Sequence, residues 1–293
     1  VGALDTLRAM PPGKPNQRTF VGFADPVFST EQTQVVAALQ VNTGTTSDNK
    51  IGVRGGSIKL RGLIKVEKLE EMASVDLSVL PPLPDTREEV NEIARALQAD
   101  PDQDVFTGTA ATETRVKSLN LSNYRVIAFA THGLIPGDVD GLVQPALALS
   151  SPEVVGGEED GLLTMGEVLG LQLNADWVIL SACNTGAGAG AGAEAISGLG
   201  RAFFYAGARA LLVSNWPVET TSARALTTGL FRKQLANAKL SRAEALRQTM
   251  VDLIEGPGYI EPQTGKVAFA YAHPIFWAPF SLIGEGGRTA ASH

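Results

Sequence analysis

The chain has a single cysteine among its 293 residues, so it cannot form an internal disulfide. Free thiols persist in reducing compartments, and we therefore expect a cytoplasmic protein. No apolar stretch approaches the roughly 18 residues that cross a bilayer, and no basic and apolar leader begins the chain, so we expect no membrane partner. No Lys/Arg block stands out and the formal charge is −7, which argues against direct binding of nucleic acid.

The composition allows a large buried core, because 44% of the residues are hydrophobic. The chain begins at Val1 rather than at methionine, and we expect it to be part of a longer protein. We expect one domain over residues 1–293, with an N-terminal portion (1–85) and a second portion (86–293). Segment 42–50 has the composition of a loop and is expected to be disordered.

Apolar runs alternate with helical patterns along the chain. The runs 124–131 and 177–181 predict buried strands, because each is short, apolar and ends in small polar residues. Thr86 and Glu89 have the spacing of a capping box, which predicts that a helix begins at Thr86. Strands that alternate with helices predict an α/β fold with a mostly parallel sheet flanked by helices on both faces. Further strands are expected at 19–23, 60–63, 104–106, 146–150, 208–214 and 279–283, and helices at 86–98, 112–119, 164–169, 194–206, 220–236 and 241–254.

His132 and Cys183 each follow a predicted buried strand. In an open α/β sheet, ligands bind outside the carboxyl ends of the strands. A thiolate is a strong nucleophile toward an amide carbonyl, and an imidazole can protonate the departing amine. Gly133 leaves its N–H unobstructed, so the backbone N–H groups of Gly133 and Cys183 are the expected oxyanion donors. Taken singly, a lone cysteine is more often a packing residue and a lone histidine a loop residue.

Five ordered blocks carry a resemblance to a known family. They are residues 129–133, 179–186, 198–208, 214–218, and 273–274 with 277–280. Together they resemble the CHAT domain, a caspase-like cysteine peptidase family commonly joined to tetratricopeptide repeats. The resemblance implies a caspase-hemoglobinase fold and endopeptidase activity through His132 and Cys183, whose separation of 51 positions (183 − 132) is close to the roughly 50 of caspase-type proteases. It also implies no metal or organic cofactor, and regulation by an upstream repeat or sensor domain or by an activating protein. We therefore expect residues 86–293 to be the catalytic portion, and the parent to be a bacterial regulatory protein.

The residues that contact a protein substrate are less explicit in the sequence. Ser214, Asn215 and Trp216 follow a predicted strand and are expected to dock the main chain of an extended peptide. Asp140 and Glu219 lie near the expected cleft, where either would favour Lys or Arg before the scissile bond. The alternative is that both are solvated acids, with Glu219 in the first turn of a helix.

The helix that starts near residue 220 also departs from the family pattern. Thr220 stands where the family usually has aspartate, and its hydroxyl is expected to cap that helix.

Two other functions stay open. Gly188, Gly190 and Ala193 fit a phosphate-cradling pattern of a dinucleotide-binding enzyme, although the glycine run begins five residues after the strand ends and the next strand lacks the ribose-binding acid. A non-catalytic scaffold with the same fold is the other alternative. No second histidine or cysteine stands at ligand spacing from His273, so no metal is assigned.

Overall fold

The computed structural model of the chain describes residues 16–33, 50–53, 56–59, 76–181, 191–216, 218–261 and 264–287, besides residues 6, 7, 9 and 14. Its strands are β1 (Arg18–Ala24), β2 (Lys50–Val53), β3 (Gly56–Lys59), β4 (Val105–Thr107), β5 (Tyr124–Ala130), β6 (Gly133–Leu134), β7 (Ala146–Ala148), β8 (Leu162–Thr164), β9 (Trp177–Leu180), β10 (Ala210–Ser214), β11 (Tyr259–Ile260), β12 (Val267–Phe269) and β13 (Phe280–Gly284).

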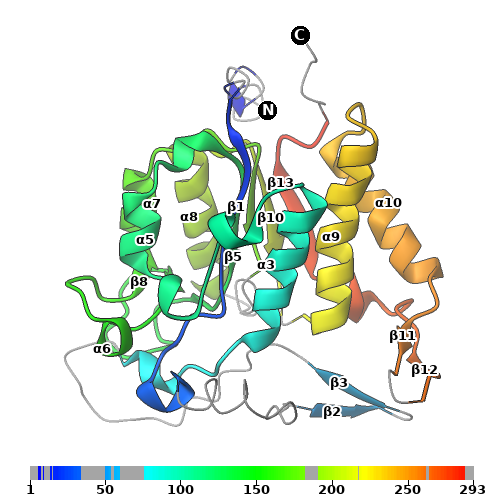
Figure 1. The fold of residues 1–293 in the computed structure, drawn as a ribbon, viewed down its shortest axis with the longest axis horizontal. Helices are drawn as coiled ribbons and strands as arrows, with labels where there is room; N and C mark the ends of the chain where they lie inside the picture. The colour runs from blue at the N-terminus through cyan, green and yellow to red at the C-terminus, as the bar shows by residue number, and fades with distance from the viewer. Residues whose placement is uncertain are drawn as a thin grey trace.

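The helices stand in two groups on either side of a central sheet (Figure 1). They are α3 (Pro84–Ala96), α4 (Pro101–Asp104), α5 (Glu113–Ser118), α6 (Pro152–Val155), α7 (Met165–Gly170), α8 (Ala191–Ala206), α9 (Thr220–Ala236) and α10 (Arg242–Glu255), with 3-10 turns η1 (Leu77–Val79), η2 (Gly108–Ala110), η3 (Leu121–Asn123) and η4 (Pro274–Phe276). A search of the described residues finds no helix with the length and apolar character needed to span a bilayer.

Among the described residues, the central sheet has six strands in the order β13–β10–β9–β5–β1–β4. Its neighbours pair parallel, except that β13 pairs antiparallel with β10. Parallel neighbours require crossover connections, which helices supply here. Strand β1 precedes residue 85, yet it pairs with β5 on one side and β4 on the other. The predicted α/β fold with a mostly parallel sheet is confirmed.

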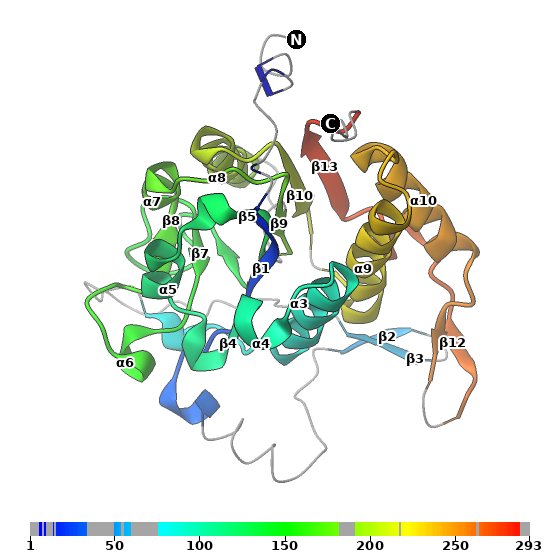
Figure 2. The ribbon, with the colours of Figure 1, turned by 45° about the horizontal axis from the view of Figure 1, so that its top comes forward.

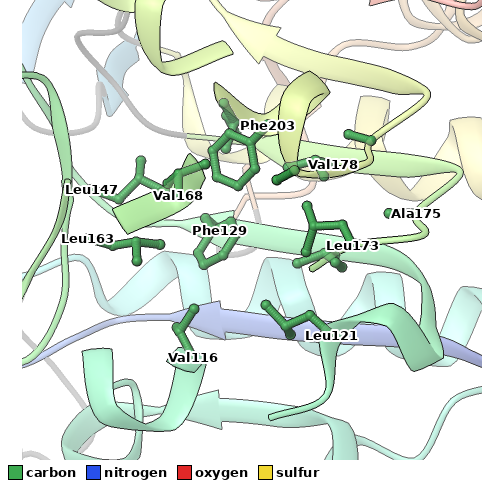
Figure 3. Close-up of a cluster of buried hydrophobic side chains, with 14 of the residues drawn as sticks. Val116, Leu121, Phe129, Leu147, Leu163, Val168, Leu173, Ala175, Val178 and Phe203 are labelled. Atoms are coloured by element: carbon green, nitrogen blue, oxygen red, sulfur yellow. The ribbon is translucent and has the colours of Figure 1, made fainter. Parts of the chain in front are cut away.

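One face of the sheet packs against α5, α7 and α8. Successive side chains of a strand point to opposite faces, and Phe129 of β5 and Leu180 of β9 belong to this layer. Phe203 of α8 packs on Phe129 with 5.7 Å between the ring centroids (Figure 3). Each such side chain contributes roughly 1.5–3 kcal/mol when it is fully buried. The layer therefore fixes which residues of β5 and β9 face this side.

The opposite face packs against α3, α9 and α10, as the turned view shows (Figure 2). Ala128 of β5 and Ile179 of β9 point into this second layer. Gly22 of β1 lies beneath α3, where an added Cβ would come within 3.2 Å of the Cβ of Val90 and 2.8 Å of the Phe20 ring. Glycine at this position therefore lets α3 lie close against the sheet.

The start of α3 corrects one prediction. The helix begins at Pro84, because proline at the first helical position has the required φ and needs no amide partner. Thr86 is inside the helix, where its hydroxyl accepts the N–H of Asp25 at 2.9 Å and donates to the Leu83 carbonyl at 2.7 Å. The prediction that Thr86 and Glu89 form a capping box is therefore wrong.

Most other predicted elements are present, with ends shifted by a few residues. The capping box of the helix near residue 164 is formed by Thr164 and Glu167. The predicted strand at 60–63 and the loop at 42–49 lie outside the described residues, whereas Lys50 begins β2.

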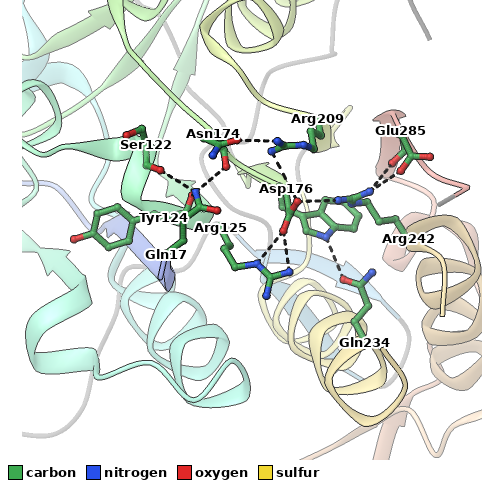
Figure 4. A network of polar contacts seen from close by, with 11 residues as sticks. Gln17, Ser122, Tyr124, Arg125, Asn174, Asp176, Arg209, Gln234, Arg242 and Glu285 are labelled. Carbon is green, nitrogen blue, oxygen red and sulfur yellow. Dashed lines mark hydrogen bonds and ion pairs between the residues drawn. The ribbon is translucent and has the colours of Figure 1, made fainter. Parts of the chain in front are cut away.

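An ionic network holds the amino-terminal edge of the sheet (Figure 4). Asp176 immediately precedes β9 and accepts two hydrogen-bonding contacts at 3.0 Å from Arg125. Its other carboxylate oxygen lies 3.4 Å from Arg242 and 3.9 Å from Arg209. Arg242 also pairs with Glu285 at 2.6 Å. One carboxylate thus offsets charge from three guanidinium groups that belong to different elements.

We expect Asp176→Asn to lower the free energy of unfolding by about 2–4 kcal/mol, because it removes the charge that the three arginines share at a largely buried position. Chemical denaturation measures this change. The matched control is Glu244→Gln, which removes one partner of an exposed pair with Arg247 and should leave the denaturation midpoint unchanged. Equal midpoints for the two variants would contradict a structural role for the network.

Candidate active site

Four strands of the central sheet have their carboxyl ends at the same edge. β1 leads to Asp25, β5 to His132 and β9 to Ser181, and β10 ends at Ser214. Because β1, β5, β9 and β10 are parallel, their carboxyl ends meet at the same edge. This edge is where an open α/β sheet places a binding site.

The pairing of β5 with β9 relates the two predicted catalytic residues. Val126 pairs with Trp177 and Phe129 with Leu180, an offset of 51 positions in both cases (177 − 126 and 180 − 129). The pairing continues past β9, because the N–H of Ser181 donates to the Phe129 carbonyl at 3.0 Å. The sequence positions of His132 and Cys183 differ by the same 51 (183 − 132), and residues 182–190, Cys183 included, lie outside the described residues.

His132 is fully buried, with 0% of its surface exposed. The Phe28 ring packs on it at 5.5 Å between centroids, and its Nε2 lies 2.8 Å from the Pro81 carbonyl oxygen. A carbonyl oxygen can only accept a hydrogen bond, so we assign the proton of the neutral ring to Nε2. Nδ1 is buried and has no hydrogen-bond partner among the described residues. The ring therefore holds an available acceptor atom on the side away from Pro81.

Burial lowers the pKa of His132 to about 4, and the hydrogen bond to the Pro81 carbonyl opposes this shift. Desolvation disfavours the charged imidazolium, which is why the first effect dominates. The ring is therefore neutral at neutral pH, with Nδ1 able to accept a proton.

Gly133 begins β6, which pairs antiparallel with β7. The N–H of Ala148 donates to the His132 carbonyl at 2.9 Å, so residue 132 occupies a hydrogen-bonded position of this ladder. Hydrogen-bonded and non-hydrogen-bonded pairs alternate in antiparallel sheets, and Gly133 opposite Leu147 is therefore a non-hydrogen-bonded position. The N–H of Gly133 points away from β7, as an oxyanion donor requires.

The predicted docking segment lies at the carboxyl end of β10. Ser214 is the last residue of β10 and is paired with Phe280 of β13, so β10 is not a free edge. The backbone N–H of Asn215 donates to the Pro279 carbonyl at 2.8 Å, and its side-chain amide donates to the same oxygen at 2.8 Å. Both donors of Asn215 are therefore occupied by the residue before β13, and docking of a peptide main chain at Ser214 and Asn215 stays a prediction. Trp216 follows them and is half-buried.

The two candidate acids have different surroundings. Asp140 is exposed in the loop after β6. Glu219 is buried, and its two carboxylate oxygens accept the N–H groups of Thr221 at 3.1 Å and Ser222 at 2.7 Å. Glu219 is therefore the N-cap of α9, and the prediction that Thr220 caps this helix is wrong.

Asp25 is a further feature that sequence reasoning did not interpret. Its φ of 47° places it in the left-handed region, which turns the chain after β1. Its carboxylate pairs with Arg87 at 2.9 Å, and burial raises its pKa against the opposing effect of Arg87. The turn leads to Phe28, the residue that packs on His132. The contacts made by Phe28 and Pro81 lack a sequence signal, because both residues reach His132 from remote segments.

The sequence of the chain matches a known protein family. A family model described as CHAT domain matches residues 3–285. The chain belongs to the CHAT-domain family. The resemblance carried by the five sequence blocks is therefore confirmed.

This CHAT domain also resembles part of much longer proteins. Tetratricopeptide repeat protein 28 of Homo sapiens is 28% identical over 233 residues, which cover 70% of this chain and 8% of that protein. Tetratricopeptide repeat protein 28 of Mus musculus is also 28% identical over 233 residues, covering 70% of this chain and 9% of that protein. The chain thus spans less than a tenth of the length of these curated relatives.

One carboxylate cluster of the CHAT domain has the spacing of metal ligands. Oxygens of Glu113, Glu159 and Glu167 lie within 4.8 Å of one another. The ammonium nitrogen of Lys117 is 2.6 Å from Glu113 and 2.7 Å from each of the other two. A lysine thus supplies the positive charge at this cluster, and we assign no metal to it.

The buried imidazole makes a testable contribution to pH-dependent stability. Between about pH 6.5 and about pH 4, the unfolded chain binds a proton at His132 that the folded protein excludes. Above about pH 6.5 the neutral ring therefore makes its full contribution to the free energy of unfolding. As the pH decreases from about 6.5 to about 4 this contribution is lost, by up to about 3 kcal/mol. We expect His132→Gln to lack this part of the acid destabilisation in urea denaturation across the window. An unchanged pH dependence in His132→Gln would contradict a buried neutral ring.

Proposed function

We propose that this CHAT domain is a cysteine endopeptidase in which Cys183 is the nucleophile and His132 the general base and acid. The observation that carries the proposal is the state of the His132 ring: buried, protonated at Nε2 toward Pro81, and left with an unpartnered Nδ1 among the described residues. Cys183 follows Ser181 by two residues, which span at most about 7 Å of chain. The equal offset of 51 positions in the pairing of β5 with β9 supports the proposal that Cys183 and His132 leave neighbouring strands at the same level.

The proposed reaction assigns a proton to each step. Nδ1 of His132 takes the thiol proton while Sγ of Cys183 bonds to the scissile carbonyl carbon. The N–H groups of Gly133 and Cys183 stabilise the resulting oxyanion. The C–N bond then breaks as the imidazolium returns its proton to the leaving amine, and water hydrolyses the acyl-enzyme to regenerate the thiol. The low pKa of His132 favours the return of the proton, and the reaction needs no metal or organic cofactor.

Regulation by an attached region extends the proposal. The relatives are tetratricopeptide repeat proteins by name, and the chain covers less than a tenth of each. We propose that an upstream repeat region or an activating protein controls this CHAT domain in its parent protein. The protein substrate would then be hydrolysed only when that region signals.

We predict that Cys183→Ala and His132→Ala each lower peptide hydrolysis by on the order of 1,000-fold or more. The double variant should lose little beyond either single variant, because the two groups act on one proton transfer. Turnover of a fluorogenic peptide library measures all three.

His273→Ala is the matched histidine control. His273 caps η4 through its Nδ1, so this variant should keep its turnover. Hydrolysis retained in Cys183→Ala would contradict the peptidase proposal. An inert wild type, with and without its parent repeat region, would favour a non-catalytic scaffold, and NAD binding would favour the dinucleotide alternative.

We predict that Glu219→Gln changes stability rather than substrate preference. Its carboxylate is occupied by two N–H groups of α9, so the substitution weakens a helix cap by roughly 0.5–2 kcal/mol. A positional-scanning peptide library, read beside thermal unfolding, separates the two effects. Asp140→Asn is the companion variant, since Asp140 is exposed and its carboxylate is the better candidate for a basic substrate side chain. A preference for Lys or Arg that disappears in Glu219→Gln but not in Asp140→Asn would contradict this assignment.

A further inference from the structure

Glu89 is a buried acidic residue that the proposed chemistry does not use. It lies on the face of α3 that packs against the sheet, and 0% of its surface is exposed. Burying a carboxylate is costly unless hydrogen bonds and charges compensate for the lost water. A carboxylate at this position therefore calls for a role that an apolar side chain of similar size would not fill.

The carboxylate of Glu89 joins three elements. The hydroxyl of Ser181 lies 3.0 Å from Oε1 and 3.3 Å from Oε2. The hydroxyl of Thr227, from α9, lies 3.3 Å from Oε1. Glu89 thus links α3 to α9 and to the end of β9.

Ser181 is held from two directions by these contacts. Its backbone N–H donates to the Phe129 carbonyl of β5 at 3.0 Å, and its hydroxyl donates to Glu89 of α3. The backbone hydrogen bond fixes the position of Ser181 alongside β5. The side-chain hydrogen bond fixes the side of the sheet, toward α3, that its hydroxyl faces. The chain reaches Cys183 two residues later. The backbone and the side chain of Ser181, the last described residue before Cys183, are therefore both held by hydrogen bonds.

The neighbouring glutamate provides a contrast on the same helix. Glu88 has a side chain that is 72% exposed and pairs with Arg224 at the surface. The two successive residues have the same chemistry and different surroundings. Substitutions at 88 and 89 can therefore separate the effect of the buried contact from the effect of losing a negative charge on α3.

We propose that Glu89, acting through the Ser181 hydroxyl, is a positioning residue for the thiol of Cys183, which follows Ser181 by two residues. The inference rests on the proposed function of Cys183 as nucleophile. Glu89 itself touches neither substrate nor reacting atoms. Its effect is geometric, and a displacement of about 1 Å at a reacting atom can cost on the order of 100-fold in rate.

The test combines turnover with labelling of the thiol. Glu89→Gln and Ser181→Ala should each lower kcat for peptide hydrolysis about 10–100-fold, with KM within about twofold, because the reacting groups are misaligned while substrate binding is kept. The double variant should be no slower than the slower single variant, since both substitutions remove one contact. Glu88→Gln should match the wild type. Iodoacetamide labelling is unambiguous because Cys183 is the single cysteine, and its rate should fall about fivefold or more in the Glu89 and Ser181 variants.

The outcomes distinguish this inference from the proposed function. A wild type that does not hydrolyse peptides would count against the peptidase proposal, while slower labelling in the two variants would still support positioning of the thiol. The inference would be overturned if both variants were labelled at the wild-type rate or if the losses were additive in the double variant. A change confined to KM or to substrate preference would also overturn it. Far-UV circular dichroism checks folding, and Ser181→Ala keeps the test decisive if Glu89→Gln does not fold.

Discussion

The alignment of β5 with β9 is the constraint on which the rest of the site depends. The two strands lie in the middle of the sheet, and their side chains alternate between two apolar layers. A shift by one residue would move Phe129 or Leu180 out of the layer it occupies, which makes the alignment strongly specified. The core therefore acts on function as well as stability, because it determines which residues leave adjacent strands at the same height.

A second constraint is the dry environment of His132. Phe28 and Pro81 come from segments that precede α3. The Phe28 ring packs on the imidazole, and the Pro81 carbonyl lies at Nε2. Burial keeps the ring neutral, and the carbonyl selects which nitrogen carries the proton. These two effects together leave Nδ1 as the atom that can exchange a proton with a neighbouring group. The chemistry assigned to His132 follows from its surroundings rather than from its identity alone.

Much of this arrangement could be predicted from the sequence. Short apolar runs located β5 and β9, and the residues just after them are the members of the proposed dyad, because strand ends and their polar successors are local signals. The contacts of Pro81, Phe28 and Glu89 could not be predicted, since each depends on packing between distant segments.

The errors have physical causes as well. A capping-box pattern at Thr86 was overridden by proline at the first helical position and by contacts to Asp25. The sequence also did not reveal that β13 pairs antiparallel with β10 and that the Asn215 side chain donates to the Pro279 carbonyl. Pairing between remote strands leaves no mark in the sequence around Asn215, whereas Pro84 is a local signal for the start of α3.

The central claim is that His132 is a neutral imidazole with its proton on Nε2 and an available Nδ1. Nitrogen-15 NMR of the imidazole side chains tests this directly, and the chain has only three histidines, so His132→Gln identifies the resonances. At neutral pH the account predicts a protonated Nε2 and a non-protonated, pyridine-like Nδ1 for His132. A ring protonated at Nδ1 alone, or at both nitrogens, at neutral pH would contradict it.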